Sequence, residues 1–162
     1  MLLMKLLLVP ILAGWPLAAN AVLPGQPALA PNSAPSEYGD DFDWSRKGPT
    51  EFLDRLRQSY RAGQELPFYS VHGEHRGWVT EADVPQLLEL ATSTDPCLAV
   101  VSTLSSWLPD RPSTVGHEAL YILAGFRAGK YPPELASTRW SGTLEEYRQW
   151  WQTHEARSLT RP

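Results

Sequence analysis

Residues 83–108 read DVPQLLELATSTDPCLAVVSTLSSWL, and this stretch decides the fold that the sequence predicts. Its first part carries apolar residues at the i, i+3, i+4, i+7 spacing of an amphipathic helix: Val84, Leu87, Leu88 and Ala91. Asp83 and Gln86 can form a capping box, which leaves Pro85 in the first turn, where its missing N–H costs nothing. In the alternative, the helix starts at Thr80 and Asp83 closes the box. We expect the later start, with residues 80–82 as a lead-in turn.

A second helix is expected after the break at residues 93–96. Asp95 is a good N-cap, and Pro96 suits the first helical position. The apolar residues that follow spread almost around a helical circumference, which is typical of the central helix of a bundle: Cys97, Leu98, Val100, Val101, Leu104, Trp107 and Leu108. Pro109 and Pro112 would end this helix.

The third helix of the stretch is expected to start at Ser113 or Thr114 and to stop before Pro132 and Pro133. Its apolar stripe consists of Val115, Ala119, Ile122, Leu123 and Phe126, and its C-terminal signals are Arg127, Gly129 and Lys130. Two internal glycines, at positions 116 and 125, cost helix stability. They indicate close backbone approach to a neighbour or simple tolerance.

Two further helices flank this core. Residues 49–62 carry an apolar face and end before Gly63, whereas Thr143 and Glu146 can cap a last helix with an aromatic stripe of Tyr147, Trp150 and Trp151. We expect this last helix to dock on the others. Between them, residues 66–79 are rich in aromatic and β-branched residues around glycines, which favours a short hairpin or an extended loop. The predicted fold is therefore all-α, a small bundle of about five helices.

The helix, Asp95-Pro96 turn and apolar second helix resemble one unit of the HEAT-like repeat proteins, over residues Thr80 to Trp107. Leu98-Ala99 stands where such repeats commonly have Val-Arg, and no second copy recurs at a fixed period. The resemblance implies a HEAT-like array of helical hairpins as a variant of the bundle. It also implies a role in binding other proteins, and it transfers no catalytic residue.

The N-terminus predicts export. Lys5 precedes an apolar run at residues 6–13, and Ala19-Asn20-Ala21 fits a signal-peptidase site, so we expect a signal peptide at residues 1–21. A proline-rich tether would follow at 22–45, then a helical domain at 46–156 and a disordered tail at 157–162. The product would be periplasmic or extracellular, without stable membrane insertion after cleavage.

Composition narrows the class of partner. The chain has 162 residues, 43% of them hydrophobic, which is enough for one domain with a proper core. Its formal charge is -4, and a phosphate-binding surface needs a basic face, so nucleic acid and anionic membranes are not expected as partners. The only cysteine, Cys97, cannot form an internal disulfide and is expected to be a small buried apolar group, although a helix N-terminus could activate its thiol.

Polar chemistry concentrates in the loop before the core stretch, where we expect a partner-binding site made of His72, Glu74, His75, Arg76 and Trp78. The predicted function is a non-enzymatic exported module that binds another protein, of the inhibitor or immunity type, with no cofactor. The alternative is a metal-dependent hydrolase that uses His72, Glu74 and His75, with His117 completing the ligands. The spacing differs from the usual metalloprotease motif, because Gly73 lies between the ligands in an expected turn.

Overall fold

A computed structural model describes residues 41–159 and has a mixed α/β architecture. The helices are α1 (Pro49–Arg61), α2 (Val84–Leu90), α3 (Val115–Ala128) and α4 (Leu144–Leu159). Two short 3₁₀ turns accompany them, η1 (Glu81–Asp83) and η2 (Ser137–Arg139). The strands are β1 (Phe68–Val71), β2 (Pro96–Cys97), β3 (Ala99–Ser102) and β4 (Ser113–Thr114). The expected signal peptide and residues 22–40 of the expected tether lie outside the described residues.

The strands form two small pairs. β1 pairs with β3 in parallel, with Phe68 opposite Ala99 and Val71 opposite Ser102. β2 pairs with β4 antiparallel, and Ala136 makes a further antiparallel bridge to Val101 of β3. Because parallel strands need a crossover, the chain passes through η1 and α2 between β1 and β3. The carboxyl ends of β1 and β3 therefore lie at one edge, which we call the carboxyl edge.

The expectation of an all-α bundle with about five helices is wrong, because the expected second helix is replaced by β2 and β3. All four residues of β3 are buried. A short strand that is covered on both faces gives a continuous apolar run, and periodicity alone cannot separate such a run from a buried helix. The helix pair implied by the HEAT-like resemblance is consequently not present at residues 80–107.

The expected hairpin at residues 66–79 is also not formed. β1 lies in this segment, but its pairing partner is β3, roughly thirty residues later in the chain, and residues 72–80 continue without a second strand. The alternative expectation, an extended loop, describes those residues better. The aromatic and β-branched composition therefore indicated a strand correctly but not its partner.

The other helices follow their end signals. Thr114 caps α3 through a hydrogen bond from His117 N to its Oγ1 (3.2 Å), and Gly129 ends α3 with a φ of 70°. α1 ends next to Gly63, and the Thr143–Glu146 box precedes α4. α2 begins at Val84, as the expected later start has it, with Pro85 in its first turn. The capping box is the one of the alternative, because Thr80 N donates to Asp83 Oδ2 (2.8 Å) and the box starts η1.

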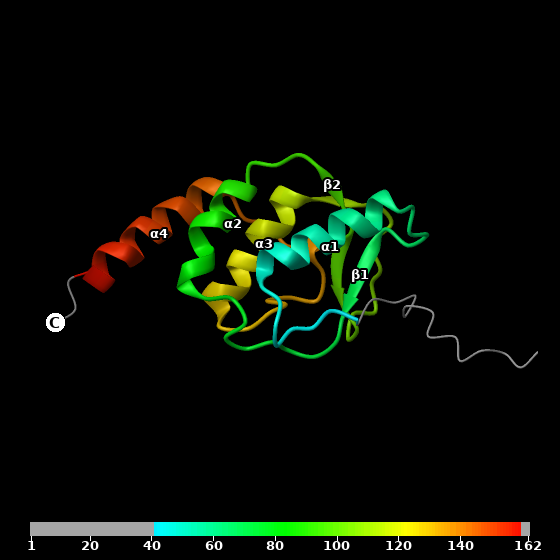
Figure 1. The fold of residues 1–162 in the computed structure, drawn as a ribbon, viewed down its shortest axis with the longest axis horizontal. Coiled ribbons are helices and arrows are strands. Elements are labelled where there is room, and N and C mark those ends of the chain that lie inside the picture. The colour runs from blue at the N-terminus through cyan, green and yellow to red at the C-terminus, as the bar shows by residue number, and fades with distance from the viewer. Residues whose placement is uncertain (1–40, 160–162) are drawn as a thin grey trace, which may run out of the picture. The chain divides into compact units, whose positions relative to one another are not determined.

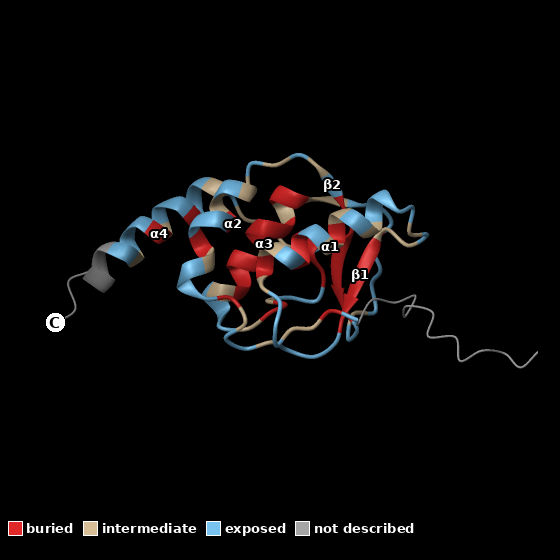
Figure 2. Ribbon diagram, in the orientation of Figure 1, coloured by how far each residue is buried: buried red, intermediate tan, exposed pale blue. Residues whose placement is uncertain are grey.

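α3 is the central helix, and most of its length is buried in Figure 2. It packs against α1, α2 and α4, with α1 in front of it in Figure 1. The aromatic stripe of α4 docks as expected, since Tyr147 and Trp151 are buried. Phe42 is buried in the same core and Trp44 packs against it, so residues 41–48 are anchored to the domain. α4 continues to Leu159, past the expected boundary at residue 156.

Gly116 confirms the expected close backbone approach. A Cβ at this position would lie 2.5 Å from the carbonyl oxygen of Ser93 and 2.7 Å from that of Ala91. Gly116 N also donates to the Ser93 oxygen at 3.1 Å. The start of α3 can therefore lie directly against the turn that follows α2.

Replacing Gly116 by Ala is expected to lower the free energy of unfolding by up to about 2 kcal/mol. Ala is favoured over Gly inside a helix by about 1 kcal/mol, but overpacking against backbone atoms costs about 1–3 kcal/mol and decides the sign. Urea unfolding followed by tryptophan fluorescence measures the change. Ala128→Gly, at an exposed position of α3, is the control that calibrates helix propensity in this helix. A Gly116→Ala variant more stable than the parent would contradict the close approach.

Among residues 41–159, no helix has both the length and the apolar content that crossing a bilayer requires.

Candidate functional site

Three segments meet at the carboxyl edge. The loop at residues 72–78 follows β1, and the loop at residues 103–112 follows β3. Residues 130–136 form backbone hydrogen bonds to the first loop and to β3. His75 and Tyr131 exchange two of them (2.7 and 3.2 Å), and Ser102 N, at the end of β3, donates to Leu135 O at 2.8 Å. In open α/β sheets, ligands bind outside the carboxyl ends of the strands, where the loops diverge. The carboxyl edge is therefore the first place to look for a binding site.

Two hollows lie side by side at this edge and share Lys130 as a common wall. The first, here called the leucine hollow, has a volume of about 200 Å³ and is lined by residues that include Glu74, Ser102, Leu104, Pro132 and Leu135. The second, the glycine hollow, has a volume of about 230 Å³ and is lined by residues that include Gly77, Val79, Gly125, Phe126 and Tyr131.

Large hydrophobic side chains are exposed in the segments that meet at the carboxyl edge. Leu104 is 81% exposed, Leu108 57% and Leu135 54%, and the Trp107 ring lies partly exposed beneath the Arg139 guanidinium, 5.7 Å from its centre. Leu104 and Leu135 both line the leucine hollow, and we call these two residues the Leu104 patch. Burying a leucine side chain is worth about 1.5–3 kcal/mol, so a domain that leaves three leucines in solvent forgoes that stabilisation. Clustered exposure of this kind marks interaction surfaces.

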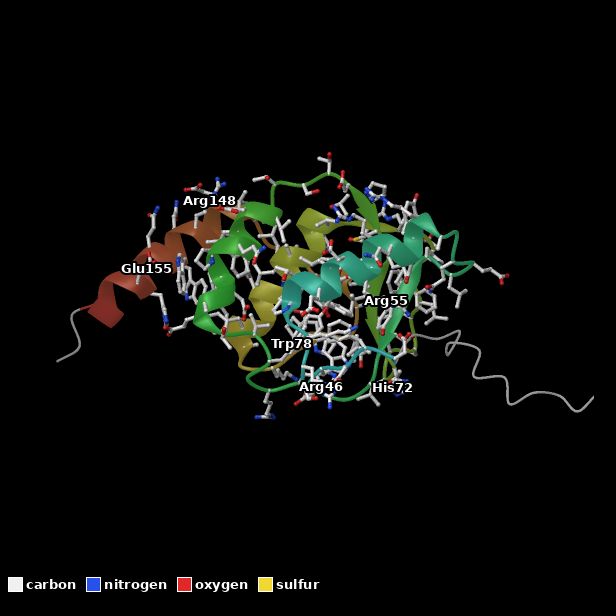
Figure 3. All side chains as sticks on the ribbon, viewed as in Figure 1. Arg46, Arg55, His72, Trp78, Arg148 and Glu155 are labelled. Atoms are coloured by element: carbon white, nitrogen blue, oxygen red, sulfur yellow. The ribbon has the colours of Figure 1, made fainter. Side chains whose placement is uncertain are left out.

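The predicted partner-binding residues do not all face solvent. His72, Glu74 and Arg76 are exposed, whereas His75 and Trp78 are half-buried. The His75 ring stacks on Trp44 at a centroid distance of 3.9 Å, and Trp78 Nε1 donates to Lys47 O at 2.8 Å. In Figure 3, His72 lies past the end of β1 and is well separated from Trp78. His75 and Trp78 thus anchor the loop to residues 41–48. Among the predicted partner-binding residues, Glu74 lines the leucine hollow, next to Gly73.

Charges at the shared wall are arranged around Glu74. Its carboxylate accepts from Lys130 Nζ (2.6 Å) and from Arg76 (3.2 Å). The hydrogen bond from Lys130 lowers the pKa of the Glu74 carboxyl, and Arg76 adds to this effect. A second carboxylate, that of Glu134, lines the leucine hollow together with Glu74 and Lys130. The two cations and the two carboxylates therefore balance in charge.

The ligand set of the metal-hydrolase hypothesis does not assemble. The two loop histidines have different environments, because His75 is stacked on Trp44 and His72 is exposed. The His117 Nε2 lies 2.8 Å from Ser137 O, on the side of α3 next to η2. In the part of the chain that the structure describes, no three His, Cys, Asp or Glu side chains are placed to hold a metal ion.

Sequence reasoning missed the Leu104 patch and Lys130. It placed Leu104, Trp107 and Leu108 on the buried surface of a helix. The signal that could have corrected this lies in residues 103–113, where serines and prolines are dense enough to indicate a loop: Ser105, Ser106, Pro109 and Pro112. Leu135 and Lys130 reach the site because residues 130–136 form backbone hydrogen bonds to residues far away in the sequence. No local sequence pattern predicts such pairing.

A buried carboxyl group connects three elements of the core. Glu118 on α3 is fully buried, and its Oε1 accepts from Ser137 Oγ at 2.7 Å. The same Ser137 Oγ accepts from Val100 N at 3.0 Å, so the group links α3, η2 and β3. Burial raises the pKa of the Glu118 carboxyl to about 8. Cys97, on β2, is buried as expected, and burial raises the pKa of its thiol far above its usual range, as in an inert core residue.

Comparisons of the chain with protein-family models, with curated protein sequences and with solved structures give no match. They therefore do not test the resemblance of residues 80–107 to HEAT-like repeats, and the interpretation of the site rests on its own geometry and chemistry.

Proposed function

We propose that this chain is a non-enzymatic, exported binding module that engages another protein through the carboxyl edge. The observation that carries the proposal is the Leu104 patch, an exposed apolar surface next to a polar rim at the ends of two parallel strands. Protein interfaces have this anatomy, with an apolar centre that is desolvated on binding and a charged rim. Glu74, Arg76 and Lys130 supply the rim.

Charge favours a protein over nucleic acid as the partner. The chain carries 18 acidic residues against 14 Lys and Arg, which gives nucleic acid no overall attraction to it. The size and acidity of the chain fit an inhibitor or immunity-type protein, and we propose a partner in the same exported compartment. The N-terminal pattern at residues 1–21 supports export to the periplasm or the medium.

Site-specific photo-crosslinking tests this function. A photoreactive phenylalanine analogue at Leu104 or Leu135 is expected to give one discrete adduct in the native envelope or medium fraction. The control position is Gln152, which is exposed on α4, away from the carboxyl edge. Mass spectrometry identifies the adduct, and the purified partner must then bind in isolation. The proposal would be refuted if the control position Gln152 gave as much adduct as Leu104 and Leu135. It would also be refuted if the purified partner did not bind the chain.

Leu104→Asp is expected to separate binding from folding. Leu104 is almost fully exposed, so its replacement should change the free energy of unfolding by less than about 0.5 kcal/mol. If Leu104 is a centre of the interface, a charge at this position should weaken partner binding by about 2 kcal/mol or more, roughly thirtyfold. Titration calorimetry and thermal unfolding measure the two quantities. Tyr60→Asp, at an exposed apolar position on α1, is the matched control.

A further inference from the structure

The loop after β3 exposes its apolar side chains and uses its serine hydroxyls to hold the backbone. Leu104 and Leu108 are more than half exposed, and Trp107 is partly exposed. Ser102 Oγ accepts from Leu104 N at 3.3 Å. Ser105 Oγ accepts from Trp107 N at 3.2 Å and donates to Trp107 O at 2.8 Å. In most surface loops the serines face water and the leucines are buried, so this loop has the reverse arrangement.

Both ends of the loop are attached to the domain. Thr103 N donates to Val71 O of β1 at 3.0 Å. At the other end Pro109 is buried, and Ser113 pairs with Cys97 in the β2–β4 pair. Because the loop is bonded internally and attached at both ends, ordering it on a partner costs little conformational entropy. The loop is therefore built to present its apolar side chains in one conformation.

The exposure of these side chains restricts the shape of the partner. Leu104 has 81% of its surface in solvent, so it projects from the domain, and only a concave surface can bury it. Concave apolar pockets that receive side chains of an extended polypeptide are the specificity pockets of endopeptidases. Complexes of such enzymes with protein inhibitors form between pre-organised surfaces whose backbones move little.

The backbone of the loop distinguishes its two leucines. Leu104 lies in a turn in which Ser105 N donates to Ser102 O at 2.9 Å, so the peptide bond that follows Leu104 belongs to that turn. Residues 107–109 are in neither a turn nor a helix, and the bond after Leu108 is formed with the nitrogen of Pro109. Because Pro109 is buried, the amine side of this bond is held in the domain, which disfavours hydrolysis. Leu108 is therefore the better substrate-like residue.

We infer that the partner is an endopeptidase whose primary specificity pocket accepts a large apolar side chain, and that Leu108 occupies this pocket while the chain stays intact. The hydrophobic slot of chymotrypsin is a pocket of this kind. The inference rests on the proposed function, since it names the class of partner that binds the carboxyl edge. Leu104 would contact the same cleft beside the primary pocket.

Inhibition of purified endopeptidases by the full chain tests the inference. Chymotrypsin and subtilisin, which accept large apolar side chains, are expected to be inhibited at micromolar or lower concentration of the chain. Trypsin, whose pocket carries an aspartate and takes cationic side chains, is expected to retain its activity. Mass spectrometry of the incubated mixture should show residues 103–112 uncleaved. Full activity of both chymotrypsin and subtilisin, or cleavage within this loop, would overturn the inference.

Substitutions of Leu108 test which residue enters the pocket. Leu108→Ala should weaken the inhibition of chymotrypsin at least about thirtyfold, and Leu108→Phe should preserve it, because a large apolar group is restored. Leu108→Lys should transfer inhibition from chymotrypsin to trypsin. Leu108 is more than half exposed, so these variants are expected to fold, and thermal unfolding checks this.

Tyr60→Lys, at an exposed apolar position on α1, is the control and should inhibit chymotrypsin as the parent does. Equal inhibition of chymotrypsin by the parent and by folded Leu108→Ala and Leu108→Lys would show that Leu108 does not enter the pocket.

The outcomes also separate this inference from the proposed function. A discrete adduct at Leu104 with a protein that is not an endopeptidase, without inhibition of chymotrypsin, would reject the inference and leave the Leu104 interface in place. Inhibition that depends on Leu108 but is unchanged in Leu104→Asp would reject the Leu104 patch as the centre of the interface and retain the inference.

Discussion

The free energy of unfolding is expected to fall by about 1.4 kcal/mol per pH unit between pH 5 and pH 8 because of one residue, Glu118. The ordinary pKa of a glutamate is 4.5, and burial raises that of Glu118 to about 8 in the folded chain. Below about pH 4.5 the carboxyl is protonated in both states. Between the two values only the folded state holds the proton, so unfolding releases it and stability falls as pH rises. Above about pH 8 the contribution levels off.

Summed over this window, the loss would reach about 4–5 kcal/mol, a large part of the stability of a small domain. Glu118→Gln should remove this part of the slope, because the amide does not ionise and can still accept from Ser137 Oγ. Urea unfolding at pH 5, 6, 7 and 8 measures the slope of the free energy of unfolding against pH in both chains. Glu89→Gln, at an exposed position of α2, is the control. The same slope in Glu118→Gln as in the parent would show that another group is responsible.

The carboxyl groups whose pKa is lowered act in the opposite direction and at lower pH. Glu74 and Glu146 are exposed and Asp43 is half-buried, and hydrogen bonds to the ionised forms of all three lower their pKa values. Their stabilisation is present above the ordinary pKa of a carboxyl group and is lost as pH falls through the lowered values. They therefore affect acid unfolding below about pH 4.5 and do not contribute to the change in stability expected for Glu118 between pH 5 and pH 8.

The second large effect is expected for Phe52→Ala, which should lower the free energy of unfolding by about 3–5 kcal/mol. Phe52 on α1 is fully buried, and aromatic rings surround it at centroid distances of 4.9–6.0 Å: Phe42, Trp44, Tyr69, Trp78 and Tyr131. These rings connect α1 to residues 41–48, to β1 and to both segments that border the glycine hollow. The cavity left by the ring cannot be filled without moving them.

Hydrogen exchange can locate this effect. In Phe52→Ala the backbone amides of His75 and Tyr131, which bond to each other's carbonyl groups, should exchange faster than in the parent chain. Tyr60→Ala, on the exposed side of the same helix, should cost less than about 1 kcal/mol and leave these amides protected. Protection of His75 and Tyr131 that survives Phe52→Ala would mean that the carboxyl edge is held together independently of α1.

Local signals predicted α1, α3 and α4 because each of these helices has a long periodic face and explicit end residues, such as Thr114 and Gly129 around α3. β3 was not predictable in the same way. Asp95-Pro96 reads equally well as a helix start or as the start of a strand, and the apolar residues after it are too few to establish a period. Only the pairing of β3 with β1, distant in sequence, decides between the two.

Only part of the candidate site could be predicted, because the rest depends on pairing between residues distant in sequence. The loop at residues 72–78 was selected as polar and rich in glycine, and it does lie at the carboxyl edge with Glu74 on a hollow. Leu104 and Leu135 reach this edge through β3 and through the backbone bonds of residues 130–136, so their exposure depends on tertiary structure alone. Because β3 was predicted as a helix, the exposure of Leu104 after its end could not be predicted.

Main-chain hydrogen bonds at Tyr131 and Leu135 hold residues 130–136 to the loop after β1 and to β3 in the unbound chain. Because this backbone is already held in place, the docking of a partner at the carboxyl edge orders little of it. We therefore expect the first encounter to lead directly to a stable complex, without a slow rearrangement. Variants of the surface should then differ mainly in residence time, and loosening the His75–Tyr131 ladder should slow the capture of the partner even where no contacting side chain has changed.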